Sequence, residues 1–138
     1  MFTLDGFTAH LAAVAAQMEH EKRHAVELGC LIIEEEAKSA IGTYKYGWPT
    51  LAASTLARKS ADTPLLQTGA LRDSITHTVE SNSSGVVFSN DPKAGWHEFG
   101  TARIPPRPFL GTAADVKGEE AARVMAEAAL RPLLLAAV

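Results

Sequence analysis

The chain has 138 residues, which suits one domain of ordinary size, and 46% of them are hydrophobic, so a folded core is expected. Thirteen basic and sixteen acidic residues give a formal net charge of −3. This balance argues against a dedicated nucleic-acid-binding module, which usually carries a basic excess. Cys30 is the single cysteine, which excludes an internal disulfide and a four-cysteine zinc site. We expect neither a signal peptide nor a membrane-spanning segment, because the N-terminus lacks a basic region and no apolar run approaches about 20 residues.

The first segment, residues 1–41, predicts a long helix, because good helix formers dominate from about residue 8 onwards and proline is absent. Apolar residues recur every three, four or seven positions, in one stripe from Leu11 to Ile32 and a second from Val26 to Ile41. The first half should therefore be buried over a narrow arc and the second half over a wide one. Such a helix is about 50 Å long, more than a domain of this size needs, so we expect part of it to project or to pack on another subunit.

Two segments of different composition follow the predicted helix. Residues 42–69 are rich in Gly, Pro, Ser and Thr and predict an extended surface loop, in which LAASTLARK is compatible with a short helix. Residues 70–111 predict an antiparallel β-meander of three to four strands and a proline-rich elbow. Its strands are LRDSITHTVE, with alternating apolar residues, then VVFSN and WHEFG. The prolines of TARIPPRPF cannot continue a sheet interior.

The last segment, residues 112–131, predicts an amphipathic helix packed on the sheet, with Pro132 ending or kinking it. The expected fold class is therefore α+β. It consists of a long N-terminal helix, a β-meander and a C-terminal helix. We see no repeat and no domain boundary, so residues 1–138 are expected to form a single domain.

The neighbouring His97 and Glu98 invite comparison with the zinc-protease motif H-E-x-x-H. The fifth position is Thr101 instead of histidine, and Gly100 would break the helix that the motif requires. His20 and His24 have the i,i+4 spacing of helical metal ligands, but no pattern elsewhere completes a tetrahedral set, and whether they bind anything stays open. Nucleophile elbows and phosphate-binding loops are absent from the sequence. We therefore predict no catalytic residue, no metal site and no cofactor.

The segment PPRP, residues 105–108, has a second interpretation. It could bind an SH3-type groove as a polyproline II helix, which would make the protein a host-type adaptor module. The short linker in which it lies, between Ile104 and Phe109, favours a packed turn instead. The adaptor stays open as the alternative function.

Three blocks follow one another in an informative order: WPTLAASTLARK, PLLQTGALRDSI and WHEFGTARIPPRPFLG. Together they resemble a family of tailed-bacteriophage proteins, the virion-morphogenesis or tail-completion proteins of Mu-like and lambda-like phages and prophages. The similar region runs from Trp48 to Gly111, and the first helix matches only in type. The resemblance implies a non-enzymatic structural protein of the head–tail joint, variously described as a tail-completion, tail-terminator or head–tail connector protein.

The resemblance also implies partners. Copies would form a ring, a hexamer in preference to a dodecamer, through whose channel DNA passes without sequence-specific binding. Neighbouring neck, connector or tail-tube proteins would lie above and below it, with no membrane involved. The protein would be made in the host cytoplasm and reside in the virion. Because aromatic residues and arginine concentrate at interface hot spots, we predict these subunit contacts: Tyr44, Tyr46, Trp48, Arg72, Arg103, Pro106, Arg107 and Phe109.

The alternative for Trp48 and Phe109 is packing in the core of their own chain. For Arg107 we predict that replacement by alanine weakens assembly more than it weakens the folded subunit.

Overall fold

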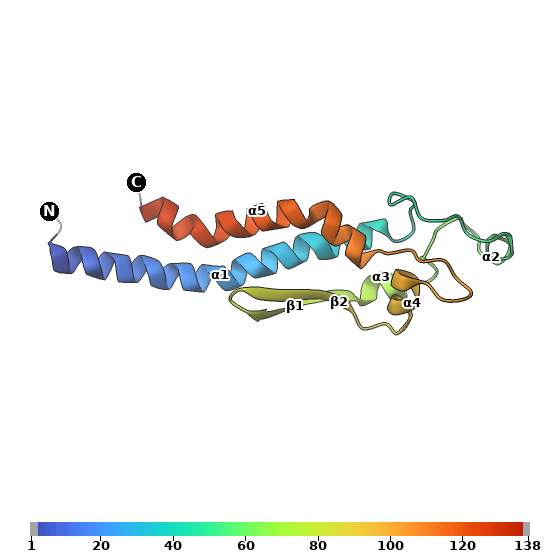
Figure 1. Cartoon of the computed structure of the whole chain (residues 1–138), viewed down its shortest axis with the longest axis horizontal. Coiled ribbons are helices and arrows are strands. Elements are labelled where there is room, and N and C mark those ends of the chain that lie inside the picture. Colours follow the sequence, from blue (N-terminus) through green and yellow to red (C-terminus); the bar gives the residue numbers. More distant parts are fainter. Residues whose placement is uncertain (1–2, 137–138) are drawn as a thin grey trace.

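Two long antiparallel helices, α1 (Leu4–Ala40) and α5 (Leu110–Ala136), dominate the computed structural model, which describes residues 3–136 (Figure 1). Thr3 caps α1, because its side-chain oxygen accepts a hydrogen bond of 3.0 Å from the backbone N–H of Gly6. With 37 residues, α1 is about 55 Å long. The predicted long N-terminal helix is confirmed, and it begins a few residues earlier than about residue 8.

The burial of α1 follows the predicted division into two halves. Between Leu4 and His24 only Val14 is buried, whereas buried residues recur at every turn from Ala25 onwards. The buried residues of α5 are small (Ala113, Ala121, Ala128) together with Pro132. Small side chains let two helix backbones approach closely, and a side chain at Gly29 of α1 would collide with Met125 of α5.

The sheet is a single antiparallel hairpin of β1 (Ile75–Ser81) and β2 (Ser84–Ser89). Ile75 pairs with Ser89 and Thr78 with Val86, and the register is irregular between Val79 and Ser81. The hairpin packs along α1 on a face next to the one that α5 covers, so that α1 contacts both (Figure 1). Within residues 3–136 each strand therefore has one edge without a neighbouring strand.

The predicted third strand is wrong, because WHEFG belongs to a short helix, α4 (Lys93–Phe99). The carboxylate of Asp91 accepts a hydrogen bond of 2.9 Å from the backbone N–H of Lys93 at the start of this helix. Pro92 already has the helical φ of −60°, which suits the first turn. An acidic cap followed by proline is a helix-start signal, and it outweighs the apolar alternation of five residues.

The start of the predicted first strand is also helical. Residues 70–74 form α3 (Ala70–Ser74), which follows Gly69 in the left-handed region at φ 87°. Leu71 and Ile75 are both buried, and a spacing of four residues places two side chains on one face of a helix as well as on one face of a strand. The pattern therefore did not discriminate between the two structures.

The remaining elements are α2 and the C-terminal helix. The short helix expected within LAASTLARK is confirmed as α2 (Ala53–Arg58). The C-terminal helix is confirmed, but it starts at Leu110 and continues past Pro132 to Ala136, so Pro132 does not end it. Proline removes one backbone hydrogen bond, and the burial of Pro132 offsets this loss. Helix α5 packs mainly on α1 and not on the sheet as predicted, because the hairpin occupies a neighbouring face of α1.

The main core cluster lies where α1 ends and α5 begins. It joins α1, the loop after it, α3, β1, α4 and α5 through these buried residues: Ala37, Ala40, Ile41, Trp48, Leu71, Ile75, Ala94, Phe109 and Ala113. We name the loops and short helices at this end, residues 41–74 and 90–109, the head. The two long helices and the hairpin, residues 4–40, 75–89 and 110–136, form the rod (Figure 1).

Candidate functional site

Glu98 holds the start of α5 from a different element. One carboxylate oxygen accepts hydrogen bonds from the backbone N–H groups of Phe109 (2.8 Å) and Leu110 (3.0 Å), and the other accepts from Gly111 (2.8 Å). The first N–H groups of a helix have no partner within the helix, and a negative charge there interacts favourably with the helix dipole. Glu98 therefore caps the start of α5.

Arg107 ties the elbow to the loop that follows α1. It is 6% exposed. Its guanidinium donates to the backbone oxygen of Pro49 from Nε (3.1 Å) and Nη2 (2.9 Å), and to that of Thr50 from Nη2 (3.0 Å). The indole N–H of Trp48 adds a hydrogen bond of 3.0 Å to the backbone oxygen of Pro108. The proline-rich elbow is thus a packed turn whose arginine is buried in its own chain.

His97 is half-buried between these groups. Its Nδ1 is buried and makes no hydrogen bond within residues 3–136. Burial, followed by the nearby positive charge of Arg107, lowers the pKa of His97, so the imidazole is neutral at pH 7. In the part of the chain that the structure describes, no three His, Cys, Asp or Glu side chains are placed to hold a metal ion.

The aromatic residues of the loop after α1 also bond within the chain. The Tyr44 hydroxyl donates to the carboxylate of Asp62 at 2.5 Å, and the Tyr46 hydroxyl donates to Glu36 at 3.0 Å. Burial and the carboxylate of Glu36 raise the pKa of Tyr46 well above its usual value. The rings of Tyr46 and Trp48 pack edge to face with their centroids 5.6 Å apart.

The structure therefore divides the predicted interface residues into two groups. Trp48, Arg107 and Phe109 are buried within the chain and Tyr44 and Tyr46 are partly buried, whereas Arg72, Arg103 and Pro106 reach the surface. Sequence reasoning missed two large exposed side chains on α4, Trp96 (53% exposed) and Phe99 (83% exposed). A helical assignment of WHEFG would have placed them on one face, since they are three residues apart.

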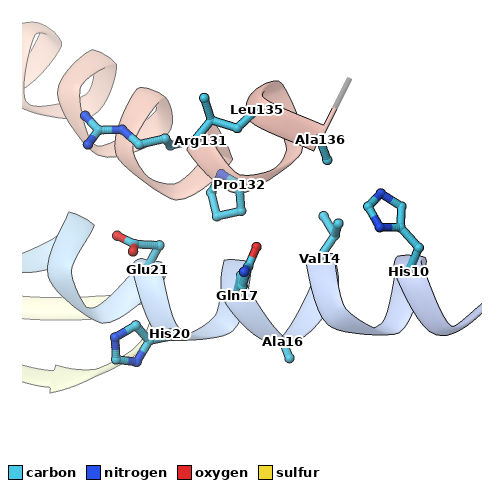
Figure 2. A pocket seen from close by; sticks show the side chains of 10 residues that line it. All are labelled: His10, Val14, Ala16, Gln17, His20, Glu21, Arg131, Pro132, Leu135 and Ala136. Carbon is cyan, nitrogen blue, oxygen red and sulfur yellow. The ribbon is translucent and has the colours of Figure 1, made fainter. Parts of the chain in front are cut away.

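The far end of the rod carries apolar residues that the chain leaves uncovered. On α1 these are Leu4, Phe7 and Leu11, and on α5 they are Leu130, Leu133, Leu134 and Leu135. Beside them the two helices leave a pocket of about 700 Å³. Figure 2 shows Val14 and Gln17 of α1 and Pro132 of α5 pointing into this space, while His20 points away from it. Large exposed apolar patches are uncommon on monomeric proteins.

A buried polar contact joins the hairpin to α1. His77 Nδ1 is hydrogen-bonded to the buried carboxylate of Glu34, whose other oxygen accepts a hydrogen bond of 2.7 Å from Lys38. Burial acts to raise the pKa of Glu34, but hydrogen bonds from Lys38 and His77 and their charges outweigh it, so the pKa lies below its ordinary value. This cluster holds the hairpin in register on the helix.

Comparisons with known proteins add no relative: no family model, curated protein or solved structure matches the chain. Among residues 3–136, none of the helices combines the length and apolar character that crossing a membrane requires.

Proposed function

We propose that this protein is a non-enzymatic structural subunit of the head–tail joint of a tailed bacteriophage, a tail-completion, tail-terminator or neck protein whose copies form a ring around the DNA channel. The observation that carries the proposal is the uncovered rod end. Leu4 is 81% exposed and Leu135 is 70% exposed, at the end of the molecule opposite the core. Helices with such ends are stabilised when another subunit covers them.

Two further features support assembly into a ring. Both strands of the hairpin have an edge without a strand beside it in the described part of the chain, and small monomeric proteins usually protect such edges. The two ends of the molecule also differ in chemistry, which suits contacts between unlike surfaces. Such head-to-tail contacts close into rings when the rotation between copies permits it, and we propose a hexamer in preference to a dodecamer.

The charge of the chain fits a channel through which DNA slides. A net charge of −3 provides few phosphate contacts to retain the duplex, so DNA would pass as cargo without sequence-specific binding. The proposed axial partners are neighbouring neck, connector or tail-tube proteins. The proposed location is the head–tail interface of the virion, after synthesis in the host cytoplasm.

The packing of the elbow weighs against the adaptor alternative. Polyproline II recognition requires an accessible PPRP segment, but Arg107 is buried and hydrogen-bonded to Pro49 and Thr50, and Pro108 accepts a hydrogen bond from Trp48. Only Pro105 and Pro106 of this segment are exposed.

Deletion of the gene from the phage or prophage that encodes the chain tests the proposal. We expect filled heads and finished tails to accumulate separately, and expression of the wild-type chain from a plasmid to restore joined particles. Electron microscopy of the particles counts both classes. Normal numbers of joined, infectious particles without the gene would refute a role in the head–tail joint.

A further inference from the structure

An apolar trough lies on the rod where α1, β2 and α5 meet. All its lining residues are apolar or glycine: Val26, Gly29, Cys30, Ile33, Gly85, Val87, Leu110, Ala114 and Met125. Gly85 makes this close arrangement possible, since a Cβ at this position would lie 2.5 Å from the sulfur of Cys30. Val26 and Cys30 are buried in it, whereas Ala114 is exposed at its edge.

The trough has room for a large side chain from another molecule. Its volume is about 280 Å³. An apolar cavity of about 150 Å³ accommodates benzene, so the trough is wide enough for an aromatic ring and part of a neighbouring side chain. The side chains of residues 3–136 leave this volume open.

The head carries an exposed aromatic side chain of a size that fits the trough. Phe99 is 83% exposed at the end of α4, and Trp96 is 53% exposed one turn before it. Gly100 follows at φ 76°, so the chain turns away sharply after Phe99 and leaves the ring projecting. Two neighbouring exposed aromatic residues are typical anchors of a protein interface.

Charge favours a contact between the head of one copy and the rod of another. The head contains seven lysines and arginines and four acidic residues, whereas the rod contains six lysines and arginines and twelve acidic residues. Lys93 and Arg103 are exposed in the head, close in sequence to the aromatic pair, and Asp115 is exposed beside Ala114 at the rim of the trough. Complementary charges of this kind orient two surfaces before they dock.

We propose that Phe99 of one copy inserts into the trough of a second copy, with Trp96 packing on the rim. This inference rests on the proposed ring and identifies which surfaces meet in it. The two surfaces lie at different places on the same chain, so every copy offers one projection and one trough. Repetition of that contact produces a closed ring or a filament, and not only a dimer.

Two single variants test the contact from either side in the full chain. Phe99→Ala removes the projection, and Ala114→Phe fills the trough from its exposed rim. We expect each to weaken self-association about tenfold or more, because a central aromatic anchor is lost or blocked. Native mass spectrometry measures the assembly, and circular dichroism with thermal unfolding verifies the fold. Matched controls are Val116→Ala, an exposed apolar residue two positions from Ala114 and on another face of α5, and Ala114→Ser, which leaves the trough open.

Mixing the two variants gives the sharper result. The Phe99→Ala chain retains an open trough, and the Ala114→Phe chain retains its projection, so one productive contact remains between them. We expect the mixture to form one-to-one heterodimers through this contact, while each variant alone associates about tenfold more weakly than the wild type. The two chains differ in mass, so native mass spectrometry identifies the heterodimer directly.

Failure of this inference differs from failure of the proposed function. If the wild-type chain forms rings and Phe99→Ala forms them equally well, the ring survives and the Phe99 contact is overturned. A folded but monomeric mixture, or equal loss of assembly in the Val116→Ala control, also overturns it. If the wild-type chain itself never assembles, both the ring and the contact fail.

Discussion

Several large side chains are buried in the head, whereas those at the free end of the rod are exposed. In the head, Phe109 is fully buried and Arg107 and Trp48 donate hydrogen bonds to backbone carbonyls of their own chain. At the free end of the rod, Phe7 and Leu134 remain about half exposed or more. The head therefore stabilises itself, whereas the rod end gains most when a neighbour covers it. Substitutions in the two regions should separate folding from assembly.

The largest effect on folding is expected from Phe109→Ala. The side chain is fully buried in the main core cluster, so its removal should lower the free energy of unfolding by about 3–5 kcal/mol. The matched variant Phe7→Ala at the rod end should change the unfolding of the monomer by less than about 0.5 kcal/mol. Urea denaturation followed by circular dichroism measures both. Similar losses in the two variants would remove the distinction between head and rod end.

Arg107→Ala comes next. The substitution leaves the backbone oxygens of Pro49 and Thr50 without their charged donor, and we expect a loss of about 2–3 kcal/mol in unfolding free energy. The sequence alone predicts that this substitution weakens assembly more than the folded subunit; from the hydrogen bonds within the chain we expect instead that the folded subunit loses more. Arg103→Ala, at an exposed position of the same elbow, is the control and should leave stability nearly unchanged. A stable Arg107→Ala monomer that fails to assemble would restore the original prediction.

Glu98→Gln tests the join between head and rod. The amide retains an acceptor oxygen but loses the charge that faces the start of α5, so we expect a loss of about 1 kcal/mol. Glu119→Gln, on the exposed surface of the same helix, serves as the control. Thermal unfolding at low salt resolves the difference. Unchanged stability in Glu98→Gln would show that the cap needs no charge.

The smallest effect concerns pH and the contact between Glu34 and His77. Because the pKa of Glu34 in the folded chain is lowered, its contribution is fully present above the ordinary glutamate value of 4.5 and is lost as pH falls through the lowered pKa. Glu34→Gln should therefore cost about 1 kcal/mol at pH 7, and the two unfolding free energies should converge at acid pH. Glu35→Gln, an exposed neighbour, should follow the wild-type profile. A difference between Glu34→Gln and wild type that persists at acid pH would contradict the assignment.

The sequence predicted the elements whose signals are local and long. The stripes from Leu11 to Ile41 indicated α1, and alternation indicated the hairpin, because many residues repeat the same period. The strand prediction was wrong at α4. Only five residues showed the alternating pattern there, and the hydrogen bond from the backbone N–H of Lys93 to the Asp91 carboxylate favours a helix start instead. Glu98 was also missed as a cap, because its partners lie more than ten residues further along the chain. Phe99 is exposed because it lies on α4, so the incorrect strand prediction missed its exposure as well.

The interface residues stay a prediction, and their composition alone could not narrow them further. Aromatic residues and arginine are frequent both at interfaces and in small cores, and composition alone does not separate the two environments. Trp48, Arg107 and Phe109 proved to be buried in their own chain, whereas Arg103 and Pro106 are exposed. Packing between residues far apart in sequence determines whether such a side chain is buried or exposed. A short sequence pattern does not predict it.

The central claim is that the uncovered rod belongs to an assembly of copies, and electron microscopy of the purified full chain tests it most directly. The account predicts rings with a central channel, whose class averages show a constant number of copies. Uniform single particles of one chain, at every concentration at which the protein stays soluble, would contradict it.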